Sequence, residues 1–279
     1  MPLGNLAVPF SDSLQGVKDC PITGTKLPLV IVSHGSSGWF GLHHDVEEAL
    51  ADAGFVVAAI NHAGDTANDI SQRGSLSVMA SRPADMVRLL DFLLNDWKDN
   101  AAIDRARIGF FGFSMGGYTG LVLAGSSPDF LRIARYCTES DKTRACDQIR
   151  SGDIPPSPPH DARIRAAVIA DPASTPFTQE NLAGIQIPLQ VWRSELGGGG
   201  VDAAGVARLT RSLPGQPDIH VVPAGHYAFL PPCTPQLAAN LPRFCTDPAG
   251  FDRAAFHRDF DASVVGFFRE HRTHDGKTR

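Results

Sequence analysis

The sequence predicts an α/β protein built on one mostly parallel sheet with helices on both faces. Short apolar runs rich in β-branched residues alternate with longer segments of helical pattern, which is typical of βαβ units. With 279 residues, of which 43% are apolar, the chain is long enough to bury one large core. We therefore expect a single domain over residues 1–279.

The predicted strands are short runs that stop at a polar residue or a glycine, as buried strands do. They cover residues 27–35, 55–61, 107–113, 163–171, 188–195 and 219–226. The predicted helices cover residues 42–53, 83–95, 114–124, 201–213 and 251–271. Because strands separated by helices pair in parallel, their carboxyl ends meet at one edge of the sheet, where ligands bind. These strand ends carry His34, Asn61, Ser114, Asp171, Glu195 and His226.

Two segments interrupt this alternation. Residues 126–162 form an insertion that ends in a proline-rich linker, and residues 223–250 form a second proline-rich segment. Both leave the sheet at its carboxyl edge, so either can cover a site there. We expect residues 126–162 to be a lid-like insertion near the active site.

Charge and hydropathy exclude several classes of partner. The formal net charge is -5 and no basic cluster occurs, so we expect no nucleic-acid partner. No apolar run approaches the ~20 residues that cross a bilayer, so we expect no integral membrane association. The first ten residues, MPLGNLAVPF, lack the charged and apolar regions of a signal peptide. A small-molecule substrate is the expectation that remains.

The cysteines indicate two local disulfides. Cys137 and Cys146 flank a polar stretch, and Cys233 and Cys245 flank a proline-rich one, which leaves Cys20 free. Two disulfides would imply a periplasmic or secreted location, and five reduced thiols in a cytoplasmic enzyme are the alternative. No CxxC pair occurs and no histidine sits at ligand spacing beside the cysteines, so we expect no metal and no cofactor.

The strongest motif lies in the stretch GFFGFSMGGYTG, which begins at Gly109. In the pattern G-x-S-x-G, a serine occupies a sharp turn between a strand and a helix, and the glycines let the backbone pass close to its neighbours. Gly112, Ser114 and Gly116 satisfy this pattern, with a predicted strand before them and a predicted helix after them. Ser114 is therefore the candidate nucleophile, and a structural glycine turn is the alternative.

A serine hydroxyl needs a base and an orienting carboxylate to act as a nucleophile at neutral pH. In the strand-to-helix arrangement, the chain order is serine, acid, histidine. Among the ten histidines, His226 alone follows a late strand across a short turn, which makes it the candidate base. Asp171, at the end of the predicted strand 163–171, is the first candidate acid. Glu195 is the alternative acid, and Asp202 is a third candidate that can instead cap the following helix.

The reaction also needs two backbone donors for the oxyanion. The amide of Met115 follows the nucleophile, and the amide of Ser36 lies in the HGSSG segment after the first predicted strand. We expect His34 to brace that segment by hydrogen bonding. Four aromatic residues near strand ends are candidates for an acyl or aryl pocket, with ordinary core packing as the alternative for each: Trp39, Phe40, Trp192 and Tyr227.

From about residue 22 to its end, the sequence resembles the α/β-hydrolase superfamily. It is most similar to bacterial dienelactone hydrolase-like proteins, which resemble platelet-activating factor acetylhydrolases. The resemblance is carried by LPLVIVSHGSSG, AGFVVAAINHAGD, RPADMVRLLDFLL, GFSMGGYTGLVLAG, IRAAVIADP and HVVPAGHYAFLPPC. It implies an α/β-hydrolase fold and a Ser-His-Asp esterase in which Asp171 is the acid. The chain departs from true dienelactone hydrolases, which use a cysteine nucleophile, and from relatives that begin with an antiparallel hairpin.

Together these features predict a metal-independent serine esterase for short- to medium-chain carboxylic esters, acting through an acyl-enzyme. A lipase or a phospholipid acetylhydrolase-like enzyme is the alternative within the same chemistry. A non-catalytic binding protein with this fold is the alternative from another class, although such a protein normally lacks one member of the triad.

Overall fold

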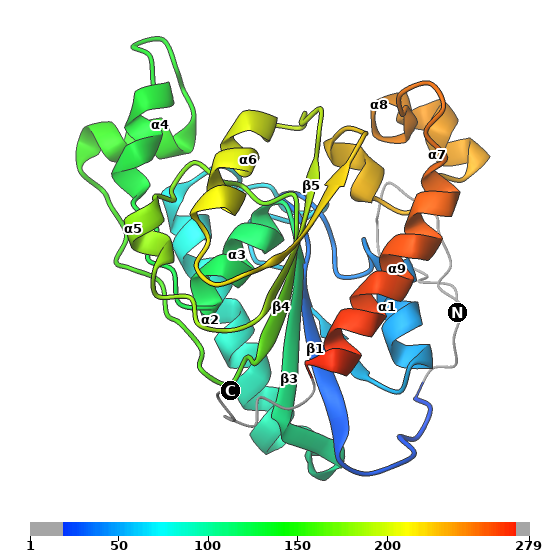
Figure 1. Ribbon diagram of the computed structural model, residues 1–279. Helices are drawn as coiled ribbons and strands as arrows, with labels where there is room; N and C mark the ends of the chain where they lie inside the picture. Colours follow the sequence, from blue (N-terminus) through cyan, green and yellow to red (C-terminus); the bar gives the residue numbers. More distant parts are fainter. Residues whose placement is uncertain (1–18, 272–279) are drawn as a thin grey trace.

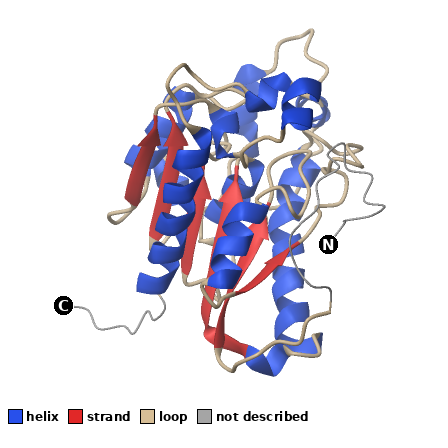
Figure 2. Ribbon diagram, turned by 90° about the vertical axis from the view of Figure 1, so that its right-hand side faces the viewer, coloured by secondary structure: helices blue, strands red, loops and turns tan. Residues whose placement is uncertain are grey.

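The computed structural model describes residues 19–271, and within them six strands form one sheet. The strands are β1 (Leu27–Ser33), β2 (Val56–Ala59), β3 (Ile103–Phe113), β4 (Ala166–Ala170), β5 (Leu189–Ser194) and β6 (Asp218–Val222). Their order across the sheet is β2-β1-β3-β4-β5-β6, and every neighbouring pair is parallel (Figure 2). Their carboxyl ends therefore meet at one edge, as expected from the sequence.

Helices cover both faces of the sheet (Figure 1). One face carries α1 (His44–Asp52) and α9 (Arg253–Glu270), which contact each other. The other face carries α2 (Leu76–Asp91), α3 (Met115–Leu123) and α6 (Ala203–Ser212). The shorter elements are α4 (Arg144–Ser151), α5 (Gln179–Leu182), α7 (Pro235–Asn240), α8 (Pro242–Cys245), η1 (Phe92–Asp96), η2 (Asn100–Ala102), η3 (Phe130–Tyr136) and η4 (His226–Phe229).

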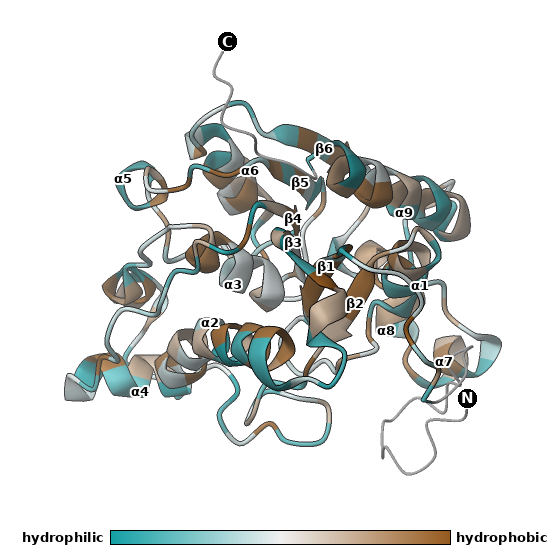
Figure 3. Ribbon diagram, turned by 90° about the horizontal axis from the view of Figure 1, so that it is seen from below, coloured by the Kyte–Doolittle hydropathy of each residue, from teal (hydrophilic) through white to brown (hydrophobic). Residues whose placement is uncertain are grey.

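The core consists of two apolar layers separated by the sheet. In β1, Leu29 and Ile31 pack toward α2 and α3, whereas Val30 and Val32 pack toward α1 and α9. This division follows from the alternation of side chains along a strand. Because both faces are covered, the strand is apolar at successive positions. In Figure 3, β1 and β2 are coloured as hydrophobic, and α2 and α9 show hydrophobic and hydrophilic residues on different sides.

The largest difference from the sequence prediction concerns α2. It begins at Leu76, well before the predicted start at residue 83, because the Ser75 side chain caps it by accepting a hydrogen bond from the Val78 amide. Pro83, a residue type that is common in the first turn of a helix, lies inside α2. The helix then continues as the π-helical turn η1 (Phe92–Asp96).

The two insertions lie on opposite sides of the carboxyl edge of the sheet (Figure 1). Residues 126–162 contain η3 and α4, which the disulfide Cys137–Cys146 links. Residues 223–250 contain η4, α7 and α8, with the disulfide Cys233–Cys245. Both expected cysteine pairs are therefore disulfides, a feature compatible with an extracellular location.

None of the described helices has both the length and the apolar character that crossing a bilayer requires. Cys20 is exposed and is not disulfide-bonded.

Candidate active site

Ser114 lies in the sharp turn between β3 and α3, with φ 57° and ψ -114°. A Cβ atom at Gly116 would approach the Ser33 carbonyl oxygen to 1.8 Å, and one at Gly112 would approach the Gly116 carbonyl oxygen to 2.3 Å. Both contacts are with backbone, so neither can be relieved by a side-chain rotation. The two glycines thus allow the turn to hold the serine in a strained conformation at the end of the strand.

The structure brings Ser114, His226 and Asp171 together. The Ser114 hydroxyl lies 3.0 Å from His226 Nε2, and His226 Nδ1 lies 2.6 Å from Asp171 Oδ2. A carboxylate only accepts hydrogen bonds, so Nδ1 carries the proton and Nε2 is free to accept from the serine hydroxyl. The Phe113 ring stacks on the imidazole, with 4.5 Å between ring centroids, and fixes its plane. This arrangement can remove the serine proton during attack on a carbonyl carbon.

Asp171 is fully buried and is oriented by Ser194, a residue that the sequence did not single out. The Ser194 amide donates to Asp171 Oδ1 at 2.9 Å, and its hydroxyl donates to Oδ2 at 2.8 Å. Of the other candidate acids, Glu195 is exposed beside β5, and Asp202 caps α6 by accepting from the Ala204 amide. Among the described residues, only Asp171 is an acidic partner of His226.

The Met115 amide directly follows the serine, and the Ser36 amide belongs to the loop after β1, where a Cβ at Gly35 would lie 3.3 Å from Ser114 Cβ. No protein acceptor for either amide occurs within residues 19–271, so both remain available to an oxyanion. The Ser36 hydroxyl donates to Asp65 Oδ1 at 2.7 Å, and the Ser37 amide donates to the same oxygen at 2.9 Å. Asp65 therefore fixes the loop that carries the Ser36 amide.

A buried arginine completes this support. Arg82 of α2 donates from Nε to Asp65 Oδ2 at 3.1 Å and from its terminal nitrogens to the carbonyl oxygens of His34 and Gly35, at 2.7 Å and 3.2 Å. Burial lowers the pKa of Arg82 to about 10, which still leaves it charged at neutral pH. Arg82 lies one residue before the predicted helix 83–95, and the sequence analysis assigned it no role.

His34 braces the same loop, as the sequence analysis expected. Burial and the neighbouring Arg82 hold the pKa of His34 well below its ordinary value, so the ring is neutral. Its Nδ1 donates to the Gly35 carbonyl oxygen at 2.6 Å, and its Nε2 accepts from the His62 amide at 3.3 Å. The ring thus ties the loop after β1 to the loop after β2.

A cavity of about 240 Å³, called here the serine cavity, opens onto Ser114 and His226. Trp39 and Tyr227 line it, together with Leu230, Pro232, Leu237 and Phe244 from the second insertion. Residues 126–162, expected as the lid, contribute nothing to its lining.

Two aromatic residues proposed for the pocket lie elsewhere. Trp192 stacks on His220 at 3.9 Å between centroids and packs against Phe260 of α9, because its position in β5 directs the side chain into the apolar layer below α9. Phe40 packs against Trp39 and does not line the serine cavity. Core packing is thus the alternative that the structure supports for Trp192, whereas Phe40 is half-buried and belongs to neither apolar layer.

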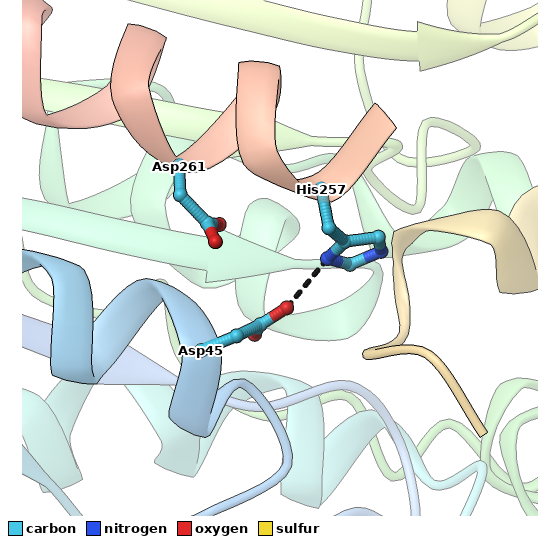
Figure 4. A group of neighbouring side chains, drawn as sticks. All are labelled: Asp45, His257 and Asp261. Carbon is cyan, nitrogen blue, oxygen red and sulfur yellow. Dashed lines mark hydrogen bonds and ion pairs between the residues drawn. The ribbon is translucent and has the colours of Figure 1, made fainter. Parts of the chain in front are cut away.

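A second group of titratable side chains lies between α1 and α9 (Figure 4). Asp45, His257 and Asp261 have ligand-type atoms within 4.8 Å of one another. His257 Nδ1 donates to Asp45 at 2.5 Å, and Nε2 donates to the Ala228 carbonyl oxygen at 2.8 Å. Burial opposes the charge, but the bonds to Asp45 and Ala228 raise the pKa of His257 overall. Both nitrogens are thus used as donors, which describes an imidazolium paired with a carboxylate rather than a metal ligand.

Comparisons with known proteins agree with this geometry. The model of the dienelactone hydrolase family matches residues 16–152. A ferulic acid esterase from Streptomyces cinnamoneus is similar in structure, with a TM-score of 0.59 and 20% identity, covering 92% of this chain and 72% of that one. The Pyrococcus furiosus esterase Pf2001 is also similar, with a TM-score of 0.53 and 14% identity, covering 88% of this chain and 84% of that one. No curated protein sequence matches this chain.

The structural neighbours establish the fold, and the family match supports a hydrolase that acts on a small molecule. The parallel sheet and the serine turn after β3 are the features that this fold requires. The chain therefore has an α/β-hydrolase fold, and it is similar to the dienelactone hydrolase family over residues 16–152.

Proposed function

We propose that this protein is a serine esterase that cleaves carboxylic esters through an acyl-enzyme. One observation carries the proposal, namely the continuous hydrogen-bond chain from the Ser114 hydroxyl through His226 to Asp171. The chain is largely buried, which strengthens its electrostatic interactions, and it ends beside a cavity open to a ligand.

In the proposed reaction, Ser114 Oγ bonds to the ester carbonyl carbon while its proton passes to His226 Nε2. The carbonyl oxygen becomes an oxyanion that accepts from the Ser36 and Met115 amides; one such donor contributes about 3 to 4 kcal/mol in the transition state. When the intermediate collapses, the carbon to alkoxy-oxygen bond breaks, and Nε2 returns the proton to the leaving alcohol. Asp171 stays ionised and stabilises the imidazolium. Water, deprotonated by His226, then releases the acid by the same steps.

The substitution Ser114→Ala tests the proposal. We expect it to abolish turnover of p-nitrophenyl acetate and butyrate and to prevent labelling by a fluorophosphonate, which the wild-type chain should incorporate once per molecule. Ser127→Ala, at an exposed serine, is the matched control. Unchanged turnover in Ser114→Ala would reject the nucleophile, and a wild-type chain that neither turns over esters nor takes the label would favour a binding protein.

A lipase is a second candidate, supported by exposed apolar side chains on residues 126–162. Leu131 is 58% exposed and Tyr136 is 57% exposed on η3, and Ile154 is 37% exposed after α4. Exposed apolar groups of this kind can contact a lipid surface. Faster cleavage of emulsified long-chain triacylglycerol than of dissolved short-chain esters would favour the lipase.

A further inference from the structure

A second, larger cavity lies beside the serine turn. It has a volume of about 640 Å³, within the range of small-molecule sites. Its apolar lining comes from Met79, Met115, Ile133, Phe177, Leu182 and Leu209. Neither Ser114 nor His226 lines it, so it is separate from the serine cavity.

The linings of the two cavities adjoin near Ser114. At three places, consecutive residues line one cavity and then the other: Arg73 and Gly74, Ser114 and Met115, and Gly199 and Gly200. These pairs come from the loop before α2, the serine turn and the loop after β5. Neighbouring Cα atoms are about 3.8 Å apart, so the two linings adjoin at each of these places. An ester bound at Ser114 therefore lies next to both cavities.

The position of His226 decides which part of the ester enters which cavity. The leaving alcohol must receive its proton from His226 Nε2, so the alcohol has to lie on the side where that ring is exposed to ligand. His226 and Tyr227 line the serine cavity and not the second cavity. The second cavity is instead lined by Met115, the residue that follows the serine. The acyl group is the part of the ester that points there.

Resting on the proposed esterase activity, we propose that the second cavity is the acyl-binding site and that it takes an apolar acyl group of medium chain length. Two of the charged side chains in its lining are already engaged: Arg208 pairs with Asp202 at 3.3 Å, and Arg132 donates to the Thr175 carbonyl oxygen at 3.4 Å. The apolar side chains of the lining favour methylene groups over charges.

The first insertion supplies one wall of this site. Ile133 and Tyr136 of η3, and Thr143 and Ala145 at the start of α4, line the cavity. The disulfide Cys137–Cys146 joins these two segments, so the wall is held in place before the acyl group binds. A preformed wall lowers the entropic cost of binding. Residues 126–162 would thus select the acyl group, while residues 223–250 face the alcohol.

The experiment uses two ester series on the full chain. The acyl series keeps the p-nitrophenyl group and compares octanoate with acetate, and the alcohol series compares hexyl acetate with ethyl acetate. Each methylene lost from an apolar site reduces binding about fourfold. We expect Ile133→Trp, which fills the second cavity, to lower the octanoate to acetate ratio of kcat/KM at least tenfold and to leave the alcohol ratio within twofold.

Three further variants complete the test. Thr143→Trp adds bulk from an exposed position whose side chain makes no capping bond, and it should repeat the Ile133→Trp result without disturbing the core. Leu237→Trp, in the serine cavity, should lower the alcohol ratio instead. Leu131→Trp, on the exposed side of η3, is the matched control and should change neither ratio.

Two results would overturn the inference while leaving the esterase intact. One is an unchanged acyl ratio in both cavity-filling variants, and the other is a fall in the alcohol ratio in place of the acyl ratio. A wild-type chain that hydrolyses no ester in either series would reject the proposed function itself, and the acyl site with it.

Discussion

Replacing Asp171 with Asn tests the orienting carboxylate most directly, because its surroundings determine how the amide must lie. Oδ1 accepts from the Ser194 amide, and Oδ2 accepts from both His226 Nδ1 and the Ser194 hydroxyl. The oxygen of the new side-chain amide would have to remain against the Ser194 backbone amide, since that donor cannot turn away. The side-chain NH₂ would then face His226 Nδ1, and the Ser194 hydroxyl can rotate to accept from it.

This orientation forces His226 into the wrong tautomer. With an amide donor facing it, Nδ1 becomes an acceptor, so the proton moves to Nε2, which can then no longer accept from Ser114. The loss of an orienting carboxylate by this route costs about 10⁴ in kcat. We expect Asp171→Asn to show a fall of that order for p-nitrophenyl butyrate, measured from initial rates, with circular dichroism as a check on folding.

Glu195→Gln is the matched control, because Glu195 is the other acid at a strand end and is exposed. Its kcat should stay within about twofold of wild type, since surface changes of this kind have small effects. A loss of less than tenfold in Asp171→Asn would refute the role assigned to this carboxylate. An equally large loss in Glu195→Gln would show that the fall in kcat does not depend on the contact between the carboxylate and His226.

Two further predictions concern stability, each measured by chemical denaturation. Arg82→Met removes the charged partner of the buried Asp65 carboxylate and should lower the free energy of unfolding by about 3 to 5 kcal/mol. Arg88→Met removes an exposed arginine from an ion pair on the same helix and should lower it by less than about 1 kcal/mol. Equal losses in the two variants would contradict the role of the buried ion pair. Burial and the Asp45 charge raise the pKa of Asp261 to about 7, so the folded state binds the proton more tightly than the unfolded chain, and wild-type stability falls as pH rises from about 4 to about 7. Asp261→Asn should remove that pH-dependent loss, so its free energy of unfolding relative to wild type should rise by about 2 kcal/mol as the pH goes from 4 to 8, allowing for partial exposure. No such rise, or the same rise in Asp259→Asn at an exposed position, would contradict the raised pKa of Asp261.

The strands were predictable because both faces of the sheet are covered. Most residues of such a strand are apolar, so β1 and β4 appear as short runs dominated by apolar residues; β6 is largely exposed, but it too overlaps its predicted range, as do all six strands. The start of α2 was harder. Pro83 resembles a first-turn proline, and only the capping contact of Ser75 shows that the helix begins earlier. A helix cap is a local hydrogen bond, and the presence of a serine in the sequence does not show whether its side chain makes that bond.

The residues that the structure brings to Ser114 were predictable where the chemistry imposes an order along the chain. Asp171 and His226 follow Ser114 in that order, each at the end of a strand. Ser194, Asp65 and Arg82 carry no such signature, because each acts through a contact with a distant segment. Ser194 is 23 residues from Asp171, and Arg82 is 48 residues from the His34 carbonyl that it binds. One sequence alone does not report which segments meet.

The same distinction applies to substrate choice. The elements around Ser114 lie at the carboxyl edge of the sheet, where the fold itself determines their positions. Each cavity takes part of its lining from one of the two insertions, with apolar and aromatic residues that look like any other packing residues in sequence. Trp192 illustrates the difficulty, since it packs in the apolar layer below α9, whereas Tyr227 lines the serine cavity. Ile133 and Leu237 are therefore the informative positions for specificity, because each fills a single cavity and neither contacts the triad proposed for the chemistry.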